Sequence, residues 1–271
     1  MEWSKLKNII LLILLATNVF LLLLVGSQEW NAAQNQSNAR ADAILVLEKN
    51  GIVMDKEALP KDLTLPLFSV ARDPEMEIES LTPLLGAVAP PPEDGSLYTG
   101  EKGTADLRGR GEFFIELSAD AYPAGADLQA HATKMLALMD VEAQAFLEVE
   151  GSLNTREVSL AQTVDGIPIL SCVVKATYLD GSLSRLDGAR LPGSPTPTGS
   201  TRELSAVTSL LRFLELLNDT GDVCSTVTVM APAYQMTSGL ADPATLTPVW
   251  YFETDSGAYV LDVNTSELKR I

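Results

Sequence analysis

The stretch "REVSLAQTVDGIPILSCVVKATYLDGSLSRLDGARL", residues Arg156–Leu191, decides the fold class. It contains three runs rich in β-branched and other apolar residues, separated by Asp165-Gly166 and Asp180-Gly181. Asp-Gly between two such runs is a strong signal for a tight turn joining antiparallel strands, because both turn residues tolerate positive φ. We therefore predict a three-stranded antiparallel meander over this stretch.

An amphipathic helix is predicted directly before the meander, over Asp127–Phe146. Its apolar positions recur at helical spacing and form one stripe: Leu128, Ala132, Met135, Leu136 and Met139. A helix of this kind buries its stripe against one face of an antiparallel sheet. Residues 119–192 are therefore expected to form one helix-plus-meander unit.

The same order of elements recurs over residues 193–271. The segment "GSPTPTG" is typical of a linker, and Ser200–Glu203 form a predicted capping box. This box is expected to open a helix with the apolar positions Leu204, Val207, Leu211, Leu214 and Leu217. Four strands should follow, at about 223–231, 248–253, 258–262 and 267–271, and their aromatic residues Trp250, Tyr251, Phe252 and Tyr259 are interpreted as core.

Residues 30–118 are expected to form a first extracytoplasmic helix/strand unit. Its predicted parts are a helix closed by Asn50-Gly51, a strand from Leu63, an exposed Pro/Gly-rich loop at 86–103 and a hairpin turn at 109–111. Between them, Asp73–Ser80 alternates acidic and apolar residues, which predicts a strand with one solvated acidic face. The predicted fold class is α+β, with repeated helix-plus-antiparallel-sheet units.

The N-terminus carries a predicted membrane anchor. An uncharged run from Asn8 to Gln28 separates Lys7 from Glu29, and about 20 apolar residues span the hydrocarbon core as a helix. Because Lys5 and Lys7 precede the run, the N-terminus is expected in the cytoplasm, with Trp3 and Trp30 at the two headgroup levels.

Residues 1–29 are therefore expected to form a cytoplasmic stub and a single transmembrane helix in the cell membrane. The bulk of the chain is then extracytoplasmic. The alternative is a cleaved signal peptide, with Val25-Gly26-Ser27 as the cleavage site.

Charge and cysteine content limit the classes of partner. The formal net charge of −17 disfavours nucleic acid and anionic lipid headgroups, because like charges repel. The two cysteines, Cys172 and Cys224, do not make a disulfide framework. The sequence leaves open whether they pair or stay as buried free thiols.

The sequence lacks the residue patterns that are typical of catalytic and metal-binding sites. His131 is the only histidine, and neither a Gly-x-Ser-x-Gly motif nor a glycine-rich phosphate loop is present, so His131 is interpreted as structural. Asp262, Asn264 and Ser266 alternate as in a calcium loop, but Glu267 stands where such a loop requires glycine. We therefore predict that the chain is not an enzyme and binds neither cofactor nor metal.

One polar residue interrupts the predicted span. An amide in hydrocarbon gains from a hydrogen bond to another helix, about 0.6 kcal/mol on average, and Asn18 shares one broad face with Leu11, Leu14, Leu15 and Leu22. We interpret this face as a contact with a second transmembrane helix. The alternative is an Asn tolerated in an ordinary anchor.

Two stretches resemble a known family. "MEWSKLKNIILLILLATNVFLL", residues 1–22, is similar to the N-terminus of YycI proteins, and "TPVWYFETDSGAYVLDVNTSEL", residues 247–268, resembles the closing hairpin of the YycI and YycH family and of the PepSY-like fold. The resemblance implies a membrane-anchored accessory protein of a Gram-positive two-component system that governs cell-wall metabolism. Its implied partners are a sensor histidine kinase like WalK (YycG) and a YycH-like single-pass protein.

The resemblance carries over Trp3, Lys5, Lys7 and Asn18 as anchor and span-contact positions, and it carries over no catalytic residue. The Pro-rich loop and the acidic balance depart from the family, which leaves the exterior partner surface undefined. The direction of regulation is also open. The alternative function is a tethered extracytoplasmic PepSY-like module that binds a ligand or inhibits a peptidase.

Overall fold

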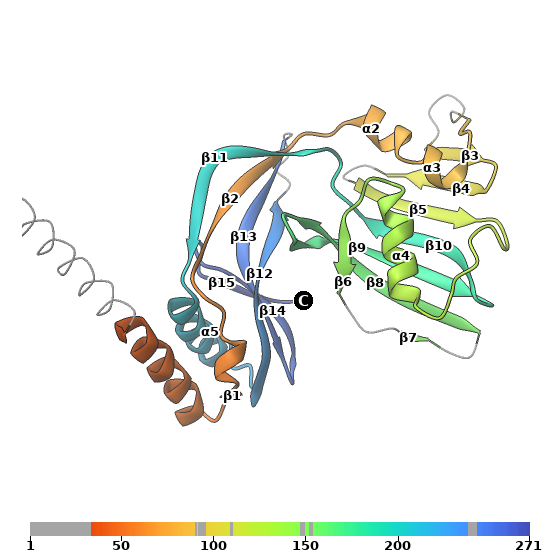
Figure 1. The fold of residues 1–271 in the computed structure, drawn as a ribbon. Helices are drawn as coiled ribbons and strands as arrows, with labels where there is room; N and C mark the ends of the chain where they lie inside the picture. Colours follow the sequence, from red (N-terminus) through yellow and green to blue (C-terminus); the bar gives the residue numbers. More distant parts are fainter. Residues whose placement is uncertain are drawn as a thin grey trace, which may run out of the picture.

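The chain folds as a mixed α+β protein that consists mostly of β-sheet, arranged in two lobes (Figure 1). The structure, a computed structural model, describes residues 34–89, 91, 96–108, 111–146, 150–151, 154–237 and 243–271. No helix among these residues is long and apolar enough to cross a membrane, and the predicted span at 8–28 lies outside them.

The predicted meander is confirmed and forms the centre of one lobe. Its strands are β8 (Thr155–Val164), β9 (Ile167–Leu179) and β10 (Ser182–Ala189), paired antiparallel in that order. Both Asp-Gly turns take positive φ at both residues, 51° and 76° in the first and 49° and 83° in the second. The local turn chemistry therefore sets this part of the sheet, as expected.

We call residues 72–192 the inserted lobe. Its sheet continues from β10 through three more antiparallel strands: β5 (Glu112–Leu117), β4 (Gly103–Leu107) and β3 (Leu97–Gly100). On the other side β8 pairs with β6 (Ala143–Ala145) and β7 (Glu150–Gly151). The helices α2 (Pro74–Glu79), α3 (Thr82–Leu85) and α4 (Leu128–Ala137) accompany this sheet, and α3 and α4 bury residues in one core with it: Leu84, Leu85, Ile115, Ala132, Leu136, Leu160, Val174 and Leu186.

The terminal lobe, residues 34–71 and 193–271, is built from both ends of the described chain. A helix over 34–49, the short helix η1 (Lys56–Ala58) and α5 (Ala206–Thr220) accompany its sheet. The strands are β1 (Val53–Met54), β2 (Leu63–Val70), β11 (Pro195–Leu204), β12 (Thr226–Thr237), β13 (Ala244–Thr254), β14 (Gly257–Asp262) and β15 (Glu267–Arg270). Phe213 of α5 stacks on Phe252 at a centroid distance of 4.1 Å. Trp250, Phe252 and Tyr259 are buried in the core as predicted, whereas Tyr251 is only half-buried.

In the described part of the chain, the two lobes share one continuous sheet through one contact between strands. β12 pairs with β9 in parallel at Tyr234 and Ile169, and Ser171 Oγ accepts a hydrogen bond from Met236 N at 3.3 Å. An apolar cluster fills this junction with residues from both lobes: Phe68, Val70, Val164, Ile169, Cys172, Leu191, Tyr234, Ala244 and Leu246. The chain crosses between the lobes twice, near 71–73 and 192–194, where Asp73 N donates to the Pro192 carbonyl at 2.9 Å.

The expected unit at 30–118 is not one unit. Its strand β2 pairs with β11 and β13 of the terminal lobe, whereas β3, β4 and β5 belong to the inserted lobe. The predicted "GSPTPTG" linker is likewise wrong, because residues 195–199 lie in β11, beside β2. Both differences have one cause: β2 pairs with β11 and β13, strands that lie more than a hundred residues away in the sequence.

Four local predictions are also corrected. Residues 74–79 form the helix α2 and no strand, because Asp73 Oδ1 accepts from Met76 N and Pro74 occupies the first turn. The predicted loop at 86–103 contains β3. Helix α5 starts at Ala206, since the predicted capping box at 200–203 lies in β11, and α4 ends at Ala137, well before Phe146.

Candidate interaction surface

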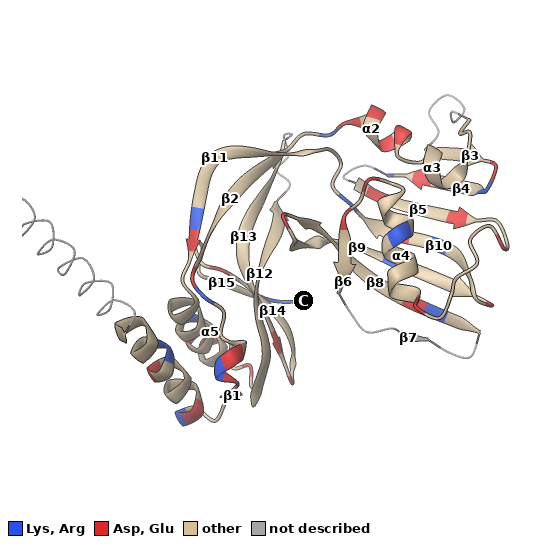
Figure 2. Cartoon of the chain, viewed as in Figure 1, with Lys and Arg blue, Asp and Glu red and all other residues tan. Residues whose placement is uncertain are grey.

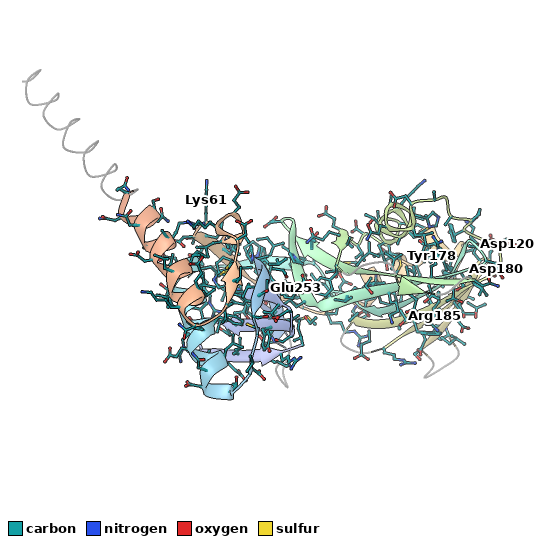
Figure 3. The ribbon with its side chains drawn as sticks, turned by 90° about the horizontal axis from the view of Figure 1, so that it is seen from below. Lys61, Asp120, Tyr178, Asp180, Arg185 and Glu253 are labelled. Carbon is teal, nitrogen blue, oxygen red and sulfur yellow. The ribbon has the colours of Figure 1, made fainter. Side chains whose placement is uncertain are left out.

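One face of the inserted-lobe sheet carries charged side chains in register. Arg185 of β10 lies opposite Thr177 of β9 and Glu116 of β5, and Asp187 lies opposite Lys175 and Phe114. Figure 3 shows Arg185 on the opposite side of the lobe from α4. We call this surface the charged face and define it by Phe114, Glu116, Glu157, Lys175, Arg185 and Asp187.

The charges of this face are linked by ion pairs. Arg185 Nε lies 2.8 Å from Asp187 Oδ1, and Lys175 Nζ lies 3.2 Å from Glu157 Oε2. The Arg185 guanidinium lies over the Phe114 ring, 5.7 Å from its centroid. Such exposed pairs add little stability, 0–1 kcal/mol as a rough range, so these side chains are available for recognition, and Arg and aromatic residues are enriched at protein interfaces.

Acidic positions are spread over both lobes (Figure 2). The four acidic residues at 73–79 do not share one solvated face. Glu77 has a side chain only 5% exposed and accepts from Arg72 Nη2 at 3.0 Å, while Asp73 caps α2. Burial of one carboxylate beside a guanidinium is a structural arrangement, because the pair needs the partner to offset its desolvation.

Arg190, a buried cation, lies next to this pair. The residue is only 2% exposed. Its guanidinium donates to Ser80 Oγ at 2.7 Å, to the Glu77 carbonyl at 3.0 Å and to the Met139 carbonyl at 3.5 Å. Burial lowers the pKa of Arg190, and Glu77 opposes that shift. The guanidinium therefore ties α2 and the end of α4 to the last strand of the meander.

A concave surface lies at the start of α4. Two adjoining hollows of about 450 and 260 Å³ share Ala126, Leu128 and Arg156. The smaller one is also lined by Gly125, Tyr178 and Asp180. We call these two hollows together the α4 groove.

The floor of the α4 groove is held by a small hydrogen-bond network. Tyr178 Oη donates to the Leu128 carbonyl at 3.2 Å and lies 3.0 Å from His131 Nδ1. Burial raises the pKa of Tyr178 well above its usual value, and burial together with Lys134 lowers the pKa of His131. His131 thus contacts a core tyrosine, in agreement with its interpretation as a structural residue.

Both cysteines are buried free thiols. Cys172 lies in the junction between the lobes, where burial raises its pKa to about 12, and burial also raises the pKa of Cys224. A thiol with a raised pKa is a poor nucleophile, because the thiolate is the reactive form. Within the described ranges no three Cys, His, Asp or Glu side chains are placed to hold a metal ion.

The site residues predicted from the sequence all fall outside the described part of the chain. They are the anchor positions Trp3, Lys5, Lys7 and Trp30 and the span positions Leu11, Leu14, Leu15, Asn18 and Leu22. The charged face and the α4 groove were not predicted. The available signal for the charged face was the alternation of polar residues along β9 and β10, at Lys175, Thr177, Arg185 and Asp187.

Comparison with known proteins shows the fold alone. No protein-family model and no curated protein matches the chain. A crystal structure of an uncharacterized protein from Eubacterium rectale is similar, with a TM-score of 0.50 and 16% identity over 78% of this chain and 86% of that chain. The Bacillus megaterium YpeB C-terminal domain aligns over 74% of this chain and 99% of its own length, but at 13% identity and a TM-score of 0.36 it supports no conclusion.

Proposed function

We propose that this chain is a membrane-anchored, non-enzymatic regulator that acts by binding partner proteins outside the cytoplasm. The charged face of the inserted lobe is the observation that carries this proposal, because it is a broad sheet surface with Arg185 and Phe114 at its centre. Regulation by binding requires different affinities for two states of a partner, a coupling of about 1–3 kcal/mol. Coupling of this kind requires no catalytic residue.

The lobe arrangement supports presentation of this face away from the bilayer. Only residues 29–33 separate the predicted span from the helix over 34–49, and five extended residues reach about 17 Å. The terminal lobe is therefore held near the membrane. The inserted lobe lies at the other end of the molecule from the helix over 34–49 (Figure 3).

The class of partner rests on the YycI-like resemblance of residues 1–22 and 247–268. On that basis the partner is a sensor histidine kinase like WalK (YycG), together with a YycH-like single-pass protein. The span is the second contact, through Asn18 and its leucine face.

A second candidate is a tethered PepSY-like module that binds a ligand or inhibits a peptidase. The α4 groove favours it, since a concave surface beside a helix suits a small ligand. The two candidates differ in what the span does. A regulator needs its own span for coupling, whereas a tethered module works on any anchor.

The test uses the full chain co-expressed with a WalK-like kinase and a reporter of its response regulator. Arg185→Glu with Lys175→Glu should weaken co-purification with the kinase and change reporter output, because reversed charges repel a partner surface that the native charges attract. Lys134→Glu, an exposed change on α4, is the matched control and should have no effect. Wild-type co-purification by the double variant, with unchanged melting, would contradict the proposed face.

Exchange of residues 8–28 for an unrelated span, or Asn18→Leu alone, tests the membrane contact. Loss of reporter coupling with retained expression supports the regulator. Full coupling through a foreign span would favour the tethered module.

A further inference from the structure

We propose that the α4 groove binds a zwitterionic ligand of amino-acid or dipeptide size. Arg156 holds its carboxylate and Asp180 holds its ammonium group. The groove lies at the start of α4, away from the charged face, so this site goes beyond the proposed regulator. It rests on the second candidate function, a ligand-binding module, and specifies the class of its ligand. Its ligand need not come from the kinase partner.

The two charges face the same hollow. Arg156 of β8 lies directly opposite Tyr178 of β9 in the antiparallel register, and Asp180 follows Tyr178 by two residues. Asp180 lies in the turn after β9, with φ at 49°, and both side chains line the smaller hollow. A ligand in this hollow can therefore meet the guanidinium of Arg156 and the carboxylate of Asp180 together.

Among the residues whose side chains the structure describes, neither Arg156 nor Asp180 has an oppositely charged group within 4.0 Å, and both are exposed. Asp127 also lines the larger hollow, but its Oδ1 accepts from Ala130 N at 2.9 Å and so caps α4. The start of α4 therefore already has a carboxylate as its cap, and the group of the groove that can bind an anion is the Arg156 guanidinium.

The chemistry of the lining selects the ligand. A guanidinium presents a planar fork that matches a carboxylate, and a carboxylate such as Asp180 accepts hydrogen bonds from an ammonium group. Leu128 and the Tyr178 ring give an apolar floor for a small side chain. The smaller hollow, about 260 Å³, falls below the roughly 300–1,000 Å³ of pockets for drug-sized ligands, so the ligand is small.

Gly125 offers a way to close the groove without disturbing the fold. A Cβ at this position would meet no atom within 4 Å, and its backbone lies outside the left-handed region that only glycine favours. A large side chain introduced there should extend into the hollow it lines. Gly125→Phe is therefore a blocking variant.

The experiment is isothermal titration of the full chain in detergent micelles with three probes: L-alanyl-L-alanine, N-acetyl-L-alanine and L-alaninamide. The dipeptide should bind, and each probe lacking one charge should bind at least about tenfold more weakly, as expected when a charged hydrogen bond is lost. Arg156→Gln and Asp180→Asn should each weaken the dipeptide by at least about tenfold. Gly125→Phe should abolish binding, and Arg185→Gln on the charged face should leave it unchanged.

Hydrogen exchange of the segment around Gly125 and Leu128 supplies a second readout that locates the ligand. Absence of both heat and protection with all three probes would overturn the proposal. Equal affinity for the dipeptide and N-acetyl-L-alanine would also overturn it, because Asp180 would then contribute nothing. Since the probes contain no protein partner, failure here is distinguishable from failure of the proposed regulator.

Discussion

Arg190 is a buried cation that links separate elements of the inserted lobe. Arg190→Met removes the donor from Ser80 Oγ and from the Glu77 carbonyl, both in buried surroundings. Loss of one partner in a buried charged network costs about 3 kcal/mol, so we expect a clear fall in the urea midpoint of unfolding. The matched control is Arg108→Gln in the same lobe, because the Arg108 side chain is 62% exposed and its partner Asp106 is itself 23% exposed.

Arg108→Gln should cost no more than about 1 kcal/mol, the usual value for an exposed ion pair. Urea unfolding of both variants, followed by circular dichroism of the full chain, measures the difference. Equal midpoints for the two variants would show that the buried guanidinium adds no special stability.

At the residue scale, the sequence predicts positions whose conformation is set locally. Asp165-Gly166 and Asp180-Gly181 were predictable because a two-residue turn depends on its own φ angles. The burial of Arg190 was not, since its partner Ser80 lies 110 positions earlier in the chain. Arg156 and Asp180 likewise converge only through the β8–β9 register.

The start of α5 is capped from another element. Asp62, which precedes β2, accepts a hydrogen bond from Ala206 N at 2.7 Å, whereas Ser205 makes no side-chain cap and contacts Thr208 Oγ1. Asp62→Ala should therefore destabilise the terminal lobe by about 1 kcal/mol, the usual cost of losing a cap. Asp62→Asn keeps an acceptor and should cost less.

Ser205→Ala is the control for the same helix end and should change the melting temperature very little. Thermal unfolding of the three variants ranks them. If Ser205→Ala proves more harmful than Asp62→Ala, the helix is capped by its own sequence neighbour after all.

Helices and strands were predicted correctly where the local sequence signals agreed. The prediction was wrong where two signals competed or where strand pairing overrode a local signal. The helix closed by Asn50-Gly51 and the three meander strands follow from periodicity and turn residues. At 73–80 the acidic-apolar alternation suggested a strand, but the Asp73 cap and Pro74 favour a helix, and the structure follows them. At 200–203 a capping pattern was overridden by pairing of β11 with β2.

At the scale of the whole molecule, the two segments that cross between the lobes are packed tightly at Gly193. A Cβ on Gly193 would lie 2.0 Å from the Ala71 carbonyl oxygen, so Gly193→Ala must push the two crossing segments apart. We expect a loss of roughly 1–3 kcal/mol, the usual cost of overpacking, and a changed distribution of distances between the lobes. Gly125→Ala, where a Cβ meets open space, is the control.

Spin labels on Lys61→Cys and Lys134→Cys report that distance, because both lysines are exposed and lie on different lobes. The native thiols are buried and have raised pKa values, so they label slowly. An unchanged distance distribution in Gly193→Ala would mean that the crossing segments do not set the lobe orientation.

The division into lobes could not be predicted from element order. Repeated helix-then-sheet order indicated consecutive units, which is the usual arrangement because neighbouring elements tend to pack together. Here β2 instead pairs with β11 and β13, so residues 34–71 complete a lobe made mostly by residues 193–271. Only long-range pairing, which periodicity does not encode, distinguishes the two arrangements.

This interleaving has a consequence for biosynthesis. The inserted lobe is contiguous and can fold as soon as residue 192 has been synthesised, whereas the terminal lobe lacks its central strands until residues 226–254 follow. Residues 34–71, which include β2, therefore stay without their strand partners while more than a hundred further residues are synthesised. A chain whose synthesis stops between residues 192 and 226 would therefore carry a folded inserted lobe and an unfolded N-terminal segment with exposed apolar residues. Chaperones and proteases act on such partly unfolded chains.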